Sequence, residues 1–442
     1  MKTRIVSIIA LIVCLVMMAA CSADTAGGSS LASKNSSTYT LPWLQSEPVS
    51  SDSKQPSSST QSPSNSSNKD SSANSSKSSS NNSYTSSQKV SSQKTSSAAT
   101  QTPTVNVNGA EKYSGTRDPW LWPFAATSIW NMPIGSGAKL EKANFKEEYC
   151  ISIDDEYLVK VPEGSPTVDV YSPSAWNARW PGQRKLGTMQ VPANFYLADA
   201  QGNSTPNNCA AFLMPDGRTI RQLEPCCRLE TGNARIVGWL HSEDQDIFGD
   251  GIKGTHYGSG LSAIGGSIRK GELTSDEPIK HALKLNVYAK NYLYYDRSAK
   301  KGYIWPADRH DSYAASGGNA YGGSNPNLRM GTLLTIPKNI TAESLGIKTK
   351  VGKKLFYALQ NYGCYIADDS AWSCYAFSAE DGVRNEVQAK YGISLNSNRN
   401  NNDAYYKDSM KLIQSLYIVT NNSPTSIGGG GTPCKPLAPD FK

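Results

Sequence analysis

A sharp change in composition near residue 111 constrains the fold of this 442-residue chain more than any other feature. Before it, Ser dominates, together with Asn, Thr, Lys and Gln. Such a segment has too few apolar side chains to offset the entropy that ordering costs. After it come most of the aromatic residues. The sequence therefore predicts a disordered Ser-rich tether over residues 21–110 and a single globular domain over 111–442.

Residues 1–20 have the pattern of a secretory signal peptide. Lys2 and Arg4 precede a mainly apolar run over residues 5–18, and two alanines then lead to Cys21. That run is shorter than the roughly 20 apolar residues that a membrane-spanning helix needs. The pattern resembles the lipobox of bacterial lipoproteins, in which the cysteine receives a diacylglyceryl group and becomes the N-terminus. The resemblance implies a chain anchored by lipidated Cys21 on the extracytoplasmic face of the cell membrane.

Short strand-like segments separated by turn signals dominate the globular part. Apolar and polar residues alternate over 282–288, which predicts a strand with one buried face. Residues 210–214 and 219–223 flank Pro-Asp-Gly and predict a hairpin. The other expected elements are a strand at 188–198, a hairpin of 291–295 with 301–305, and helices at 351–362, 379–391 and 403–416. Together they predict an α+β fold, mainly antiparallel β, of a β-sandwich or jelly-roll kind with appended C-terminal helices. A closed β-barrel is the alternative.

Charge and cysteine usage exclude two classes of function. The net charge is +7, but Lys and Arg are scattered among acids, so nucleic acid is not an expected partner. Seven cysteines follow Cys21, an odd number that leaves at least one thiol unpaired within the chain. Cys364 and Cys374 could close a short loop. No Cys-x-x-Cys pair occurs, so the cysteines predict no zinc site.

The segment 244–273 combines acids, a histidine, a serine and an arginine with many glycines. Asp244 and Asp246 copy two ligand positions of a calcium loop. Phe248 at the fifth position and the absence of Glu at the twelfth exclude an EF-hand. Calcium is nevertheless the one candidate cofactor, held by Asp244 and Asp246 in a different oxygen-rich site. The competing interpretation of the segment is a long structural crossover.

The candidate catalytic residues come from the same part of the chain. His256 or His281 would abstract a proton, because imidazole suits proton transfer near neutral pH. Arg269 would neutralise a substrate carboxylate, and Asp250 or Glu272 would serve as the acid. A lone histidine is more often structural, and that alternative stays open for each.

The aromatic balance favours a carbohydrate ligand. Tyr outnumbers Phe by 23 to 8, and nine Trp are present. Amphipathic rings suit wet clefts, where sugar rings stack on them. Trp305, Asp308 and Arg309 share one polar loop and are the candidate substrate-binding residues. Ordinary core packing explains several of the other aromatic residues.

Several longer motifs resemble a family of exported bacterial proteins to which no activity is attached. The motifs are SIWNMPIG (128–135), MPDGRTI (214–220), DQDIFGDG (244–251), GSGLSAIGG (258–266), ALQNYG (358–363) and GGGGTP (428–433). The resemblance covers nearly all of residues 120–442 and implies one domain. A looser similarity to jelly-roll alginate-type polysaccharide lyases rests on Arg269-x-x-Glu272-Leu, on His281, and on the Tyr-rich residues 288–303. It bears on substrate class only, because the Gln-x-His signature is missing.

These observations predict a membrane-anchored, extracytoplasmic lipoprotein that acts on a cell-wall or environmental polysaccharide, as a polysaccharide lyase or a glycoside hydrolase. The alternative is a lipoprotein that binds glycan, or builds a surface structure, without catalysis.

Overall fold

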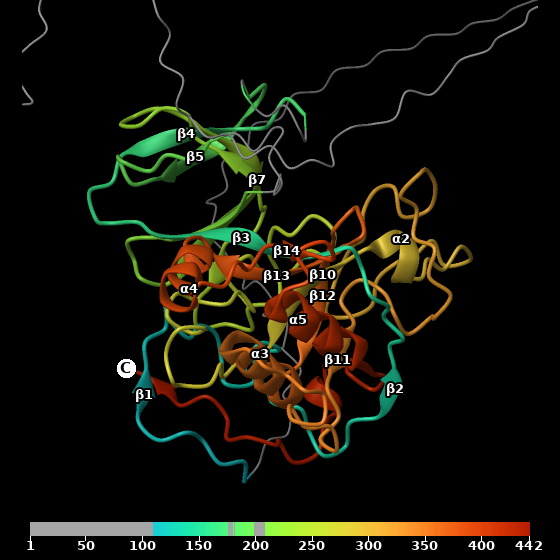
Figure 1. Ribbon diagram of the computed structural model, residues 1–442. Coiled ribbons are helices and arrows are strands. Elements are labelled where there is room, and N and C mark those ends of the chain that lie inside the picture. Colours follow the sequence, from blue (N-terminus) through green and yellow to red (C-terminus); the bar gives the residue numbers. More distant parts are fainter. Residues whose placement is uncertain (1–108, 176–179, 181, 199–207) are drawn as a thin grey trace, which may run out of the picture. The chain divides into compact units, whose positions relative to one another are not determined.

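The computed structural model describes residues 109–175, 180, 182–198 and 208–442, all of which belong to one compact unit (Figure 1). The predicted signal peptide, Cys21 and nearly all of the predicted tether lie outside the described residues. Within the part of the chain that is described, no helix has the length and apolar character needed to cross a bilayer.

Strands dominate the described part of the chain, and most of them join one mixed sheet of 14 strands. The strands are β1 (Thr116–Arg117), β2 (Leu140–Lys142), β3 (Cys150–Lys160), β4 (Thr167–Tyr171), β5 (Lys185–Gln190), β6 (Cys209–Leu213), β7 (Thr219–Cys227), β8 (Ile236–Leu240), β9 (Gln245–Asp246), β10 (Leu283–Val287), β11 (Leu333–Thr335), β12 (Cys364–Asp369), β13 (Cys374–Glu380), β14 (Ser397–Asn398), β15 (Tyr417–Val419) and β16 (Asp440–Phe441). The helices are α2 (Ala289–Tyr292), α3 (Lys350–Asn361), α4 (Val383–Tyr391), α5 (Ala404–Gln414) and the 3-10 turn η1 (Ile427–Gly429).

The sheet runs in the order β2-β15-β11-β12-β10-β13-β3-β6-β7-β8-β4-β5, with β14 beside β3 and β9 beside β7. Most of its pairs are antiparallel. The parallel pairs are β10–β12, β13–β3, β3–β6 and β4–β8. The predicted class, mainly antiparallel β with helices toward the C-terminus, is confirmed, and the strand-rich architecture is compatible with a β-sandwich.

Strand alternation separates an apolar face from a polar face in the middle of the sheet. On β3, Ile151 and Ile153 enter the main hydrophobic cluster, together with Leu283 and Leu285 of β10. Residues two apart on a strand share a face, so the intervening polar residues of both strands point the other way. The apolar face packs against α3 and α5, which lie together in the lower half of Figure 1.

The helices begin where side chains cap them. Thr349 precedes α3 and its hydroxyl accepts the amide of Gly352 at 2.9 Å, and Asp403 accepts the amide of Tyr406 at 2.8 Å at the start of α5. These two helices confirm the predictions for 351–362 and 403–416. The helix predicted at 379–391 begins only at Val383, because residues 374–380 are the buried strand β13.

Two other expectations about elements need correction. The predicted hairpin of 291–295 with 301–305 is wrong: α2 covers Ala289–Tyr292, and a single bridge joins Asp296 to Lys301. The strand expected at 188–198 is β5, which ends at Gln190. The hairpin β6–β7 and the strand β10 are confirmed.

One disulfide joins Cys150 at the start of β3 to Cys374 at the start of β13. These strands are parallel neighbours, and the two cysteines are register partners. The pairing of Cys364 with Cys374 is therefore wrong. Cys364 is a buried free thiol in β12.

Candidate functional site

The polar face of the central strands carries the densest group of buried charges. Asp154 and Glu156 of β3 alternate with the core residues, as do Lys284 and Asn286 of β10. Asn286 Nδ2 donates to Asp154 Oδ2 at 2.9 Å, and Lys284 Nζ donates to Glu156 Oε1 at 2.8 Å. Period-two alternation thus places two acids and their partners beneath the loop that contains His256.

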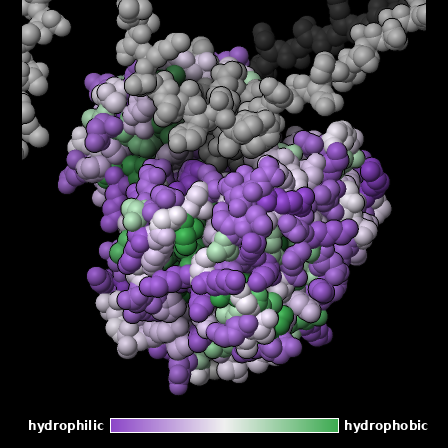
Figure 2. Space-filling view, viewed as in Figure 1, coloured by the Kyte–Doolittle hydropathy of each residue, from purple (hydrophilic) through white to green (hydrophobic). Residues whose placement is uncertain are grey.

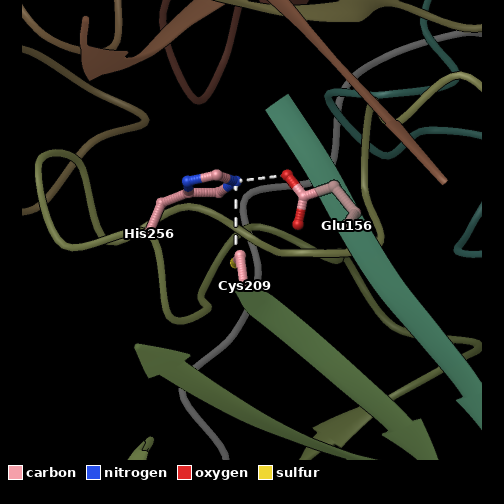
Figure 3. A group of neighbouring side chains, drawn as sticks. All are labelled: Glu156, Cys209 and His256. Carbon is pink, nitrogen blue, oxygen red and sulfur yellow. Dashed lines mark hydrogen bonds and ion pairs between the residues drawn. The ribbon is translucent and has the colours of Figure 1, made fainter. Parts of the chain in front are cut away.

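His256 is completely buried at the centre of this group. Its Nε2 lies 2.9 Å from Glu156 Oε1 and 3.9 Å from Cys209 Sγ, as Figure 3 shows with Glu156 on β3 and Cys209 on β6. Its Nδ1 lies 3.5 Å from Asp368 Oδ2. Both ring nitrogens therefore face carboxylates from strands distant in sequence.

Lys284 completes the buried network. Its ammonium donates to Glu156 and to the carbonyl oxygens of Ser262 and Ala263 at 2.7–2.9 Å, which uses its three hydrogens. It also lies 2.9 Å from His256 Nε2, since both nitrogens contact the same Glu156 oxygen.

The opposite charges of the network stabilise one another, which offsets the cost of removing them from water. Burial alone raises the pKa of Glu156, but the positive Lys284 and His256 outweigh it and lower that pKa to about 2. Burial and Lys284 lower the pKa of His256, whereas Glu156 and Asp368 raise it, and the net result is about 10. The net shift of the His256 pKa is therefore upward, which stabilises the protonated ring, and its predicted role as a base stays a prediction.

A cavity of about 480 Å³ opens beside this network. Its described lining residues include four acids, namely Asp154, Asp311, Asp368 and Asp369, and four aromatic residues, namely Trp239, Tyr257, Tyr313 and Trp372. They come from β3, β8, the end of β12 and the turn after it, and from the loops after β9 and before β11. No Lys, Arg or His occurs among the described residues of the lining.

Burial raises the pKa values of two of the cavity acids, to different extents. Burial raises the pKa of Asp154 to about 6, aided by Glu156 and Asp368 and opposed by His256 and Asn286. Burial raises the pKa of Asp311 to about 8, aided by Asp368 and Asp369 and opposed by the hydroxyls of Tyr321 and Tyr313.

The contacts of the Asp369 carboxylate indicate a structural role. Its Oδ1 accepts the amides of Ala289 and Ala371, and its Oδ2 accepts the hydroxyl of Tyr313 at 2.9 Å. Three acids with fewer contacts therefore remain for chemistry: Asp154, Asp311 and Asp368.

The predicted residues Arg269, Glu272 and His281 form a second cluster, away from the cavity. His281 Nε2 lies 3.1 Å from both oxygens of Glu272, and Arg269 Nε donates to Glu380 at 3.0 Å. Arg269 and His281 border a pocket of only about 10 Å³. The structure thus separates His281 from His256, and their predicted catalytic roles stay predictions.

The other predicted residues are exposed or half-buried, Asp246 in the short strand β9 and the rest in loops. Asp244 pairs with Arg221 at 3.1 Å and Asp246 with Arg218 at 2.6 Å, so each candidate calcium ligand faces an arginine. Asp250 accepts the amide of Ile252 at 3.0 Å.

Among the candidate substrate-binding residues, Asp308 pairs with Arg309 at 2.8 Å, and Trp305 packs against the second hydrophobic cluster. None of these six residues lines the cavity. They are the candidate calcium ligands Asp244 and Asp246, the candidate catalytic acid Asp250, and the candidate substrate-binding residues Trp305, Asp308 and Arg309. Their predicted roles stay predictions.

The sequence analysis singled out none of the four cavity acids. It assigned no strand to 150–160 or 364–369, where three of them lie. The alternation of Ile151, Ile153 and the intervening Ser and Asp was the available signal on β3. On β12, the pair Asp368-Asp369 directly after an apolar run marked a strand end.

The chain matches no protein-family model, no curated protein and no solved structure. The site is therefore interpreted from its own geometry: an acidic, aromatic-lined cavity on a strand-rich scaffold.

Proposed function

We propose that the folded part is a glycan hydrolase and that the acidic cavity is its active site. The observation that carries the proposal is that Asp154 and Asp311 line one cavity with pKa values near 6 and 8. A pair of carboxyls whose environments separate their pKa values supplies an acid and a base. At pH 7 Asp311 is protonated and can donate to the leaving oxygen, while Asp154 is ionised and acts as base or nucleophile.

The aromatic lining supports a sugar as the ligand. Trp239 and Tyr257 are each 42% exposed and are two of the six exposed large apolar side chains among the described residues. Both line the cavity, whereas the face of the molecule seen in Figure 2 is mainly hydrophilic. The volume lies in the range of small-ligand sites and suits a short stretch of glycan.

The charge of the cavity favours hydrolysis over β-elimination. A lyase that acts on polyuronates must neutralise the carboxylate of its substrate, which needs cationic or hydrogen-bonding groups. The described lining supplies acids and no Lys or Arg. A neutral or amine-bearing glycan avoids like-charge repulsion there, so this substrate class is the better fit.

The N-terminal sequence supports an extracytoplasmic place of action. The signal-like residues and Cys21 imply export and lipidation, and the Ser-rich segment gives the domain a reach of roughly 50 Å as a flexible chain. The substrate is accordingly a polysaccharide of the wall or the surroundings.

A glycan panel scored for both retention and soluble products tests the proposal. The panel contains neutral, amine-bearing and uronate polymers. We expect products from one of the first two classes, and Asp311→Asn should lower kcat by about 10²–10⁴-fold with thermal unfolding unchanged. Asp440→Asn, in an exposed pair with Lys112 outside the cavity, is the matched control. Retention without products would support the binding alternative, and products from uronates alone would overturn the substrate class.

A further inference from the structure

Three buried side chains converge where the His256 network meets the cavity. Glu224 comes from β7, His256 from the loop after β9, and Asp368 from the end of β12. One donor atom of each lies within 4.8 Å of the other two. Their exposures are 1%, 0% and 5%. The register of β7 against β8 shifts between Leu223 and Cys226, and such an irregularity redirects a side chain such as that of Glu224.

The spacing of the donor atoms in this group is long for hydrogen bonds and suits ligands of one shared cation. The 3.5 Å between His256 Nδ1 and Asp368 Oδ2 exceeds the usual hydrogen-bond distance. It matches two donors on one metal ion, because bonds of about 2.0–2.1 Å at tetrahedral angles separate donors by about 3.4 Å. Glu224 Oε1 is buried and has no hydrogen-bond partner among the described residues. A buried carboxylate oxygen without a partner costs free energy that a cation would offset.

The surroundings hold each of the three side chains by its other polar atom. His256 Nε2 donates to Glu156 Oε1 at 2.9 Å. Glu224 Oε2 accepts the amide of Tyr257 at 2.9 Å, and Asp368 Oδ1 accepts the amide of Asp369 at 2.9 Å. A carboxylate behind a metal-binding histidine is the usual way to fix its ring, and backbone amides fix the two acids similarly. Each side chain is thus oriented with one donor atom left for a ligand.

The neighbouring group of Glu156, Cys209 and His256, drawn in Figure 3, does not compete for the ion. The Lys284 ammonium lies 2.8 Å from Glu156 Oε1 and 2.9 Å from His256 Nε2, where a cation would have to sit. Burial, with Glu156 and Glu224 nearby, raises the pKa of the Cys209 thiol well above its ordinary value, so it stays protonated. His256 therefore presents Nδ1, not Nε2, to a metal.

We propose that Glu224, His256 and Asp368 bind one divalent transition-metal ion of the Mn²⁺ to Zn²⁺ series. One imidazole nitrogen with two carboxylates suits these ions, whereas Ca²⁺ takes six to eight oxygen ligands. On binding, the metal displaces any proton held at His256 Nδ1 or on the Glu224 carboxyl, and these protons leave to solvent. Asp368 and Tyr257 also line the cavity, so the ion reaches the site of the proposed hydrolysis. This inference stands independently of that activity, because occupancy is measured without substrate.

Metal binding to the full chain tests the site. Protein stripped with a chelator and dialysed is titrated with Zn²⁺ and with Mn²⁺ by calorimetry, and bound metal is counted by elemental analysis. We expect about one ion per chain and a raised Tm on loading. Glu224→Gln and Asp368→Asn should each weaken binding by about 100-fold or more. Loss of a residue that only supports a ligand already costs about 10–100-fold, so loss of a ligand should cost at least as much. Glu148→Gln, a buried glutamate paired with Tyr292, is the matched control and should bind normally.

Two results would overturn the site: no stoichiometric binding by wild type, or full binding by both variants. Circular dichroism establishes that each variant is folded, and Co²⁺ loading gives a visible spectrum that folded variants should lack. A chain that binds metal but cleaves no glycan would overturn the proposed function alone, and the reverse outcome would overturn the metal site alone.

Discussion

Two regions of this molecule use the same side-chain types to different ends. The His256 network and the Arg269–Glu272–His281 cluster each place a buried histidine against a glutamate, with a cation nearby. In the second cluster His281 and Glu272 satisfy each other, beside almost no open volume. In the first, acids outnumber cations and a cavity adjoins them. A buried histidine–carboxylate pair is therefore the better candidate for function where further acids lack a cationic partner and a cavity adjoins the pair.

The largest expected effect is on stability, at the centre of the His256 network. Lys284→Met leaves Glu156 with one cationic partner fewer in a fully buried site, which should lower the free energy of unfolding by about 3–5 kcal/mol. Lys253→Met, in an exposed pair with Glu243, should cost less than about 1 kcal/mol. Urea unfolding of both variants makes the measurement. Equal losses would show that the buried ammonium contributes no more than a surface one.

His281→Gln examines the other region, with an intermediate effect. His281 donates to Glu272 and to the carbonyl of Ala282, and the loss of charged hydrogen bonds should cost about 1.5–3 kcal/mol near pH 6. Burial lowers the pKa of His281, but Glu272 and the hydrogen bond to the Ala282 carbonyl together raise it more, so the net shift is upward. The stabilisation is therefore complete below the unfolded pKa and is lost as pH rises through the folded pKa. The stability difference from wild type should shrink accordingly at alkaline pH.

Glycan cleavage by the same variant decides whether His281 belongs to the chemistry. We expect kcat within about twofold of wild type, since His281 borders no substrate-sized cavity. A large loss of kcat with unchanged unfolding would instead restore the catalytic role that its sequence position suggested.

How far the sequence predicts the structure depends on the range of the contacts involved. The hairpin β6–β7 and the capped helices α3 and α5 follow from local signals, namely Pro-Asp-Gly, Thr349 and Asp403. The helix expected at 379–391 extends too far toward the N-terminus, because pairing with β3 and β10 makes residues up to Glu380 part of strand β13. Tertiary contacts routinely override a weak local preference of this kind.

The site is predictable only in part for the same reason. His256 stood out as the one histidine of the Gly-rich segment 244–273, in a chain that has four. Its partners Glu156, Lys284 and Asp368 lie 100, 28 and 112 residues away, and only the sheet order brings them together. The acids Asp244 and Asp246, which looked like ligands by their spacing, instead pair with arginines of the neighbouring strand β7 and the turn before it.

The last and smallest expected effect is on the pH dependence of cleavage, and it is the effect most specific to one of the two regions. The profile of kcat/KM should have an acidic limb near pH 6, where Asp154 gains a proton, and an alkaline limb near pH 8, where Asp311 loses one. Each limb should fall about tenfold per pH unit, because one proton is involved. Both limbs depend on the neighbouring carboxylates, because these raise the pKa values of Asp154 and Asp311.

Glu272→Gln supplies the control, since it changes a buried acid outside the cavity. Burial raises the pKa of Glu272, but His281 and Arg269 together lower it more, so the net shift is downward, away from both limbs. Loss of this acid should therefore leave both limbs in place. A limb that moves in Glu272→Gln would assign it to the second cluster. Because Asp154 and Asp311 respond to the same excess of negative charge, a divalent ion at Glu224, His256 and Asp368 should instead move both limbs to lower pH. A cation bound elsewhere on the chain, far from Asp154 and Asp311, should leave both limbs in place.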